Sequence, residues 1–284
     1  MTAVLVIAGY GLREALRRRV FAVVVVLTTA FLVLFWLGTH YLFDHLNNVS
    51  PPSGEIDSRT LVGATVLGLA MFATLFLGVV LAIFLTLGVV RGDAERGLLQ
   101  PLVVRPVGRT TLLGARFLGA VAVCVPYVAF VYAAAVAITD VNGSWTPDRI
   151  VLPGVELAAG VSVIAAISLL GSIFLTPTAN GIAVFIVFGA GLIAGLLGQI
   201  GHALNSHTLE RIATFTAWAA PFEALYEDAL HGITVNTGGF TRVALSLGPF
   251  GGARVAGPFL GLWVAAFLLI CGTLAALAFA RSDL

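Results

Sequence analysis

"LVGATVLGLAMFATLFLGVVLAIFLTLGVV", residues 61–90, holds thirty residues and no charged side chain. The hydrocarbon core of a bilayer is about 30 Å thick, and a helix of about 20 apolar residues crosses it. A helix through the whole stretch would be about 45 Å long, so it has to tilt or protrude from the membrane. The stretch therefore predicts a long membrane-spanning helix.

The rest of the chain has the same character. Of its 284 residues, 59% are hydrophobic and 10% are charged, whereas a typical globular protein is about 25% charged. A water-soluble fold exposes a large share of its residues and cannot hide this much apolar surface. We therefore expect an integral membrane protein.

The charges argue against two further classes. The formal net charge is +1, which gives no electrostatic support for a nucleic-acid partner. All fifteen cationic side chains are arginines. A Walker A loop needs a lysine that reaches the β- and γ-phosphates, so we do not expect this chain to bind ATP in that way.

Six stretches are long and apolar enough to span a membrane. They are residues 20–43, 61–90, 113–139, 151–175, 181–200 and 256–280, and Glu156 is the one acidic residue within them. Backbone groups in lipid must be satisfied internally, so helices are the expected form, and the alternating pattern of a membrane barrel is absent. The predicted fold is a single all-α transmembrane domain over residues 1–284.

Arginines predict the orientation, because cytoplasmic segments of membrane proteins carry an excess of positive charge. With the N-terminus inside, ten arginines lie on the cytoplasmic side and five outside. The outer five are Arg59, Arg149, Arg211, Arg242 and Arg254. Six spans then place both termini, and the loop between the second and third spans, in the cytoplasm.

Two segments outside the spans also carry a pattern. Residues 1–19 place apolar side chains opposite arginines at helical spacing, which predicts an amphipathic helix in the membrane interface. Residues 201–255 are interrupted by polar residues and by Pro221. We expect this extracytoplasmic loop to form short helices that lie on the outer surface or dip part way into the membrane.

Gly191 and Gly195 in the fifth span form a pair of small residues four positions apart. Such a pair lets two helices approach closely. The sequence leaves two uses open: packing against another helix of the same chain, and contact between two copies of the chain.

The densest charge lies in "RGDAERGLLQPLVVRPVGRTTLLGARF", residues 91–117, with five arginines and two acids around a short apolar patch. Orientation alone needs only a few of these arginines. A short element of this kind, held between two long helices, suits docking into a groove of a soluble partner. Its charges would set the register and its apolar residues would fill the groove.

This segment resembles the intracellular loop of type-2 ATP-binding-cassette (ABC) transporter permeases, especially their compact six-helix members. That loop reads Glu-x-Gly-Thr, an apolar stretch, Pro-Val-Ser-Arg, a leucine pair and Gly-Lys-Phe. The residues that match at the same spacing are Glu95, Gly97, Pro106, Val107, Arg109, Leu112, Leu113 and Phe117. The chain departs from the pattern at Leu98, Gly108 and Arg116, and Pro101 interrupts the apolar stretch.

A second, weaker resemblance lies in "AAPFEALYEDAL", residues 219–230, which is similar to the segment before the last span of these permeases. The matching residues are Pro221, Glu223 and Tyr226.

The resemblance implies a permease subunit that docks a separate ATPase through the coupling loop at residues 91–112. The docking contacts that it implies are Asp93, Glu95, Arg96, Gly97, Arg105, Pro106 and Arg109. ATP and magnesium would bind the partner ATPase, with no cofactor and no catalytic site in this chain. A second permease copy, as a homodimer rather than a heterodimer, membrane lipids and an extracytoplasmic accessory protein are the further partners.

Export, or mechanical work outside the membrane, is the activity that the resemblance implies. The expected location is the cytoplasmic (inner) membrane of a bacterium. Histidine pairs such as His202 and His207 lie five residues apart, whereas helical metal ligands are usually four apart, so no metal site is predicted.

Two other classes compete with this interpretation. A channel or secondary transporter that works alone would need ionisable residues at mid-membrane, and an intramembrane enzyme would need a polar catalytic constellation. Glu156, Asn180, Gln199 and His40 lie near the ends of spans. From the sequence we expect each of them to stand alone, which argues against both classes.

The arginine asymmetry generates a topology prediction. A reporter tag at the N-terminus or after Leu284 should read as cytoplasmic, and a tag near Ser53 or Asn236 as external, because six spans return the chain to its starting side. Protease protection and thiol labelling of tagged cells measure this. A cytoplasmic signal at Asn236 would contradict the six-span arrangement.

Overall fold

The computed structural model describes residues 19–48, 58–87, 109–235 and 257–281. Eight helices and no strand occur in these ranges: α2 (Arg19–Asn48), α3 (Ser58–Thr86), α6 (Arg109–Gly143), α7 (Val151–Phe174), α8 (Pro177–Ala203), α9 (His207–Ala219), α10 (Phe222–Gly232) and α12 (Leu260–Arg281). Six of them, all except α9 and α10, are long and apolar enough to cross a membrane. The predicted all-α membrane fold is confirmed.

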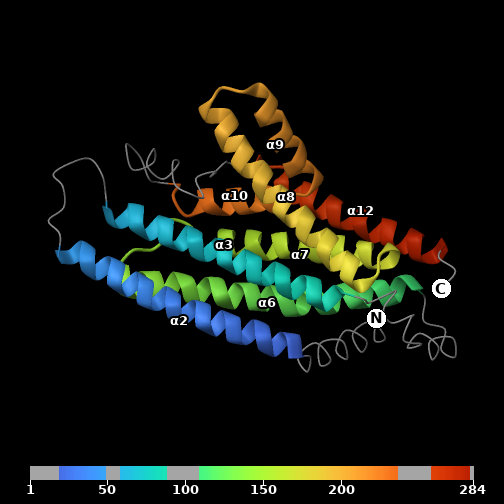
Figure 1. The fold of residues 1–284 in the computed structure, drawn as a ribbon, viewed down its shortest axis with the longest axis horizontal. Helices are drawn as coiled ribbons and strands as arrows, with labels where there is room; N and C mark the ends of the chain where they lie inside the picture. Colours follow the sequence, from blue (N-terminus) through green and yellow to red (C-terminus); the bar gives the residue numbers. More distant parts are fainter. Residues whose placement is uncertain (1–18, 49–57, 88–108, 236–256, 282–284) are drawn as a thin grey trace.

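The long helices run side by side with α7 in the middle (Figure 1). α7 packs against α3, α6, α8, α10 and α12, while α2 covers α3 and α6. We call the end where α2 begins and α12 ends the proximal end, and the end where α2 ends and α3 begins the distal end. Figure 1 shows the proximal end toward the right and the distal end toward the left.

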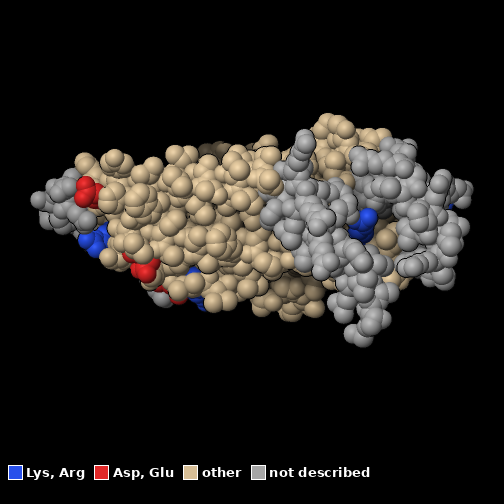
Figure 2. Space-filling model, turned by 90° about the horizontal axis from the view of Figure 1, so that it is seen from below, with Lys and Arg blue, Asp and Glu red and all other residues tan. Residues whose placement is uncertain are grey.

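The sides of the bundle are apolar. Seen from the side on which α2 lies, Figure 2 shows a broad surface without charged side chains. Large hydrophobic side chains of the long helices are exposed, such as Leu34 of α2 at 68% and Phe130 of α6 at 66% of their surface. Such a surface suits the hydrocarbon of a bilayer and not water.

Small residues allow the central helices to approach closely. A Cβ built on Gly78 of α3 would lie 2.7 Å from Val161 of α7 and 2.9 Å from Val128 of α6. Both valines are fully buried. Close backbone approach at glycine is the usual way in which membrane helices gain packing contacts, so Gly78 marks the point where α3, α6 and α7 meet.

The segment between α8 and α12 enters the bundle. α8 runs at an angle to α3 and α7 and forms a hairpin with α9 (Figure 1). α10 then packs on α7: the start of α10, at Phe222, passes beside Gly160 and Leu75, and its end, at Gly232, lies beside Pro153. Since Leu75 and Gly160 lie well inside α3 and α7, α10 runs from the interior of the bundle toward the distal end.

Candidate functional site

The loop expected to dock the partner begins and ends at the proximal end. α3 ends at Thr86 and α6 begins at Arg109. The predicted docking residues from Asp93 to Pro106 lie outside the described residues, as do residues 1–18 of the predicted interfacial helix. Arg109 is the first residue of α6. The contacts of the loop itself therefore stay a prediction.

The apolar residues that follow the loop form a small core of their own. Leu113 is 4% exposed and clusters with Leu169 and Ile173 of α7 and with Phe279 of α12. Leu112 and Phe117 pack against the same cluster. The leucine pair and phenylalanine of the loop pattern thus fasten the start of α6 to α7 and α12.

A hydrogen-bonded seam of buried polar residues joins three helices near the same end. The Thr86 hydroxyl at the end of α3 forms a hydrogen bond with the Ser168 hydroxyl of α7 at 2.7 Å, and the Asn180 amide of α8 donates to the Ser168 carbonyl at 2.9 Å. All three residues are at most 1% exposed. The prediction that Asn180 stands alone is wrong, because its partners lie on other helices.

Asn180 also shows why Gly171 is small. The Asn180 Oδ1 atom occupies the place that a Cβ at Gly171 would take. No described residue hydrogen bonds to this Oδ1 atom. Burying a polar atom without a partner costs about 1–3 kcal/mol. This cost offsets part of the stability that the hydrogen bond from Asn180 to Ser168 contributes.

Gly191 and Gly195 face the start of α10. A Cβ at Gly191 would lie 3.0 Å from Cε1 of Phe222, and a Cβ at Gly195 would lie 3.0 Å from Cδ of Glu223. Phe222 is fully buried, and its ring lies 5.4 Å from the ring of Phe188. In the structure, these glycines make room for α10 of the same chain.

Two carboxyl groups meet where α7 and α10 pack. Glu156, 7% exposed, lies near enough to Asp228 and Arg149 for both to act on it electrostatically. The prediction that Glu156 stands alone is therefore wrong as well.

Tyr226 fixes α10 to α3. Its hydroxyl donates to the Gly68 carbonyl at 3.4 Å, and burial raises the pKa of the phenol, so it remains a donor. Of the residues in the second resemblance, Glu223 and Tyr226 are thus both buried contacts of α10. Over the ranges that the structure describes, no group of three or more His, Cys, Asp or Glu side chains could hold a metal ion.

This arrangement combines an apolar bundle with a charged loop whose two flanking helices are tied into the core. A comparison with protein families matches residues 5–284 to the family described as ABC-2 family transporter protein. The chain belongs to this family. The resemblance inferred from residues 91–117 is confirmed, and the ABC-2 protein is a membrane transporter subunit. No curated protein matched the chain.

Sequence reasoning about this ABC-2 protein missed the seam and the carboxyl pair. Serine and threonine within an apolar span usually return their proton to the helix carbonyl one turn earlier, as Thr74 does to Ala70 at 2.7 Å. The Thr86 hydroxyl likewise lies 2.8 Å from a carbonyl of its own helix, that of Ala82, and nothing in the sequence shows that it also reaches Ser168 of another helix. Which threonine bonds to another helix depends on how the helices are arranged in space.

The contact between Gly191 and Phe222 of the ABC-2 protein generates a stability prediction. Overpacking a core costs about 1–3 kcal/mol, more than the roughly 1 kcal/mol that alanine gains over glycine in a helix interior. Gly191→Ala should therefore lower the melting temperature of the purified protein. Gly189→Ala is the matched control on the same helix, because nothing lies within 4 Å of a Cβ there.

Thermal unfolding in detergent, followed by circular dichroism, measures both variants. Gly189→Ala should leave the melting temperature unchanged or raise it. Equal behaviour of the two variants would show that α10 does not pack against Gly191 in the folded protein.

Proposed function

We propose that this ABC-2 protein is the non-catalytic permease subunit of an ATP-driven exporter. A separate ATPase binds ATP and magnesium and docks on the loop between α3 and α6. Its nucleotide cycle moves the loop, and the membrane helices rearrange in response. The family match over residues 5–284 carries this proposal, because it covers both the bundle and the loop.

The way in which the loop is fixed supports coupling. α3 and α6, which enter and leave it, pack against each other and against α7. A push on the loop therefore acts on both helices. The seam from Thr86 through Ser168 to Asn180 links α3 to α7 and α8, and Leu113 links α6 to α7 and α12. Coupling through contiguous packed and hydrogen-bonded elements is physically reasonable when those elements have two arrangements.

A second copy of the chain completes the transporter in this proposal. Gly191 and Gly195 are covered by α10, so the contact with the second copy uses other surfaces. α8 and α12 expose large apolar side chains, among them Ile186 at 64% and Leu269 at 70%. The transporter lies in the bacterial cytoplasmic membrane with both termini inside, in keeping with the ten-to-five arginine distribution.

The docking loop generates a test by substitution. Glu95→Ala removes one charge of the proposed contact, and Arg109→Glu reverses another. Loss of a desolvated pair costs about 2–5 kcal/mol, much of it from the partner charge left unpaired, whereas loss of a pair at the rim costs about 0–1 kcal/mol. We expect both variants to bind the ATPase more weakly, with Arg109→Glu the worse of the two.

Pull-down of the cognate ATPase and its stimulated turnover measure this effect. A glutamate is tolerated at position 109, because negative charge at a helix N-terminus stabilises the helix. Arg211→Glu is the matched control, since Arg211 is an exposed residue of α9. If both loop variants bind and couple normally, the loop does not dock the ATPase, and its arginines serve only to set the orientation in the membrane.

The polar seam generates a separate prediction about coupling. Asn180→Ala removes the bond to Ser168 without touching the loop, so the ATPase should still bind while its turnover no longer drives transport efficiently. Thr178→Ala, an exposed change in the same helical turn, is the control. Transport and ATPase activity are measured together in vesicles, and an unchanged ratio for Asn180→Ala would remove the seam from the coupling path.

A further inference from the structure

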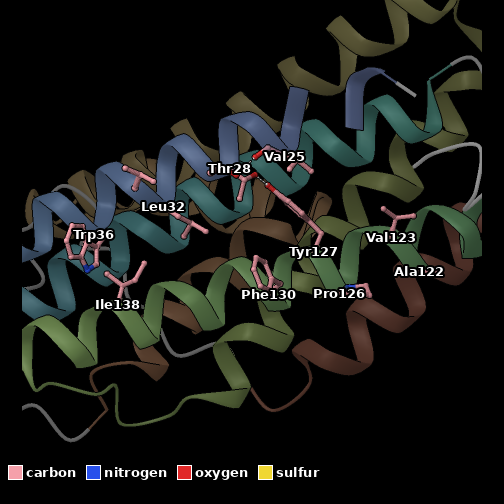
Figure 3. A pocket seen from close by; sticks show the side chains of 12 residues that line it. Val25, Thr28, Leu32, Trp36, Ala122, Val123, Pro126, Tyr127, Phe130 and Ile138 are labelled. Atoms are coloured by element: carbon pink, nitrogen blue, oxygen red, sulfur yellow. Dashed lines mark hydrogen bonds between the residues drawn. The ribbon is translucent and has the colours of Figure 1, made fainter. Parts of the chain in front are cut away.

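An apolar groove lies between α2 and α6. Its volume is about 670 Å³, within the roughly 300–1,000 Å³ range of small-molecule sites. Six residues of α2 and six of α6 line it (Figure 3): Val25, Thr28, Thr29, Leu32, Val33, Trp36, Ala122, Val123, Pro126, Tyr127, Phe130 and Ile138. None of these side chains is charged, so the groove excludes ions by desolvation.

The groove lies within the part of the protein that crosses the membrane. Both of its helices are candidate spans, and its α2 residues, 25–36, lie within the candidate span Ala22–Leu46. Eleven steps of 1.5 Å give this wall a length of about 17 Å. Phe130 and Val33 are more than half exposed, so the groove opens sideways to the hydrocarbon.

The hydroxyl protons in the groove are already used. Thr28 donates to the Val24 carbonyl at 2.7 Å, and Thr29 donates to the Val25 carbonyl at 2.9 Å. Because the single proton of Thr28 points to Val24, the 2.5 Å contact between Thr28 and Tyr127 is donated by Tyr127. The hydroxyl oxygens of Thr29 and Tyr127 can therefore still accept a hydrogen bond but cannot donate one.

Pro126 adds another acceptor to the same wall. It lies inside α6 and has no N–H, so the helical bond that the Ala122 carbonyl would receive from residue 126 cannot form. Ala122 and Pro126 both line the groove beside Tyr127 (Figure 3). The indole N–H of Trp36 is the remaining side-chain donor of the lining, and it lies toward the other end, near Ile138.

We propose that this groove binds an uncharged, lipophilic molecule that carries a hydroxyl or amide N–H donor. The apolar walls take its hydrocarbon part, and the acceptors at Tyr127, Thr29 and the Ala122 carbonyl take its donor. An acyl chain of bulk lipid has no donor to offer these atoms. The helix backbone of a second copy uses its own donors internally. The site does not depend on the ATPase or on the proposed direction of transport.

Two photoreactive probes test the proposal: a diazirine-labelled dodecanol and its methyl ether, which differ only in the donor. Each is irradiated with the full-length protein in phosphatidylcholine nanodiscs, and labelled peptides are identified by mass spectrometry. We expect the alcohol to label residues 25–36 and 122–130 about three- to tenfold more than the ether does, the effect of one net hydrogen bond.

Variants locate the site and identify the acceptor. Val25→Phe should fill the groove and reduce labelling by both probes, whereas Val26→Phe, at the neighbouring position that is 66% exposed and outside the lining, should not. Tyr127→Phe removes an acceptor and should reduce labelling by the alcohol alone. Pro126→Ala restores the N–H at residue 126, which occupies the Ala122 carbonyl, and should have the same selective effect.

Three outcomes would overturn the proposal. Equal labelling of these peptides by alcohol and ether would mean that the groove holds only hydrocarbon. Labelling that survives Val25→Phe would place the probe elsewhere. Probe-independent crosslinking of two chains through a photoreactive residue at position 25 would assign the groove to a second copy.

Discussion

Moving an apolar side chain from lipid into the protein interior gains no hydrophobic free energy, and this constraint shapes the whole structure. The helices of a membrane protein associate through close van der Waals contact and through hydrogen bonds between them. Here the close contacts occur at glycines, with Gly78 against Val128 and Val161, and Gly191 against Phe222. The hydrogen bonds between helices include the seam that ends at Asn180 and the bond from Tyr226 of α10 to Gly68 of α3. α7 packs against α3, α6, α8, α10 and α12, so it is the helix through which most of the bundle is held together.

In the proposed mechanism a polar loop acts on an apolar bundle, and the contacts at both ends of the loop support this. The residues that follow the loop, Leu112, Leu113 and Phe117, pack with α7 and α12, and the residue that ends α3, Thr86, bonds to α7. Both ends of the loop are therefore tied to the same central helix. A loop tied at only one end could swing without moving the helices, whereas here a displacement has to strain packed contacts, which have few alternative arrangements.

The spans could be predicted from the sequence because length and hydropathy depend on local residues alone, and each apolar stretch became one helix. The charged loop was informative for the same reason: the resemblance rested on the spacing of Glu95, Gly97, Pro106 and Arg109, and the family match over residues 5–284 confirmed the family. The partners of Asn180 and Glu156 were not predictable. Ser168 is twelve residues from Asn180, and Asp228 lies on a helix whose entry into the bundle depends on the glycines of α8. Those pairings follow from the three-dimensional order of the helices, which periodicity does not encode.

Two hydrogen-bond acceptors in this structure lack a donor among the described residues, and they differ in whether a molecule from outside can reach them. The Asn180 Oδ1 atom is enclosed, since its residue is fully buried and Gly171 lies against it. No ligand can reach it without separating α7 from α8, so its cost is built into the fold. The Ala122 carbonyl loses its helical donor to Pro126, yet Ala122 lines a groove that opens to the membrane. A proline in a membrane helix is tolerated when something else satisfies the freed carbonyl. At this position the satisfying group can come from outside the chain, and that makes the proline a feature of recognition as well as of shape.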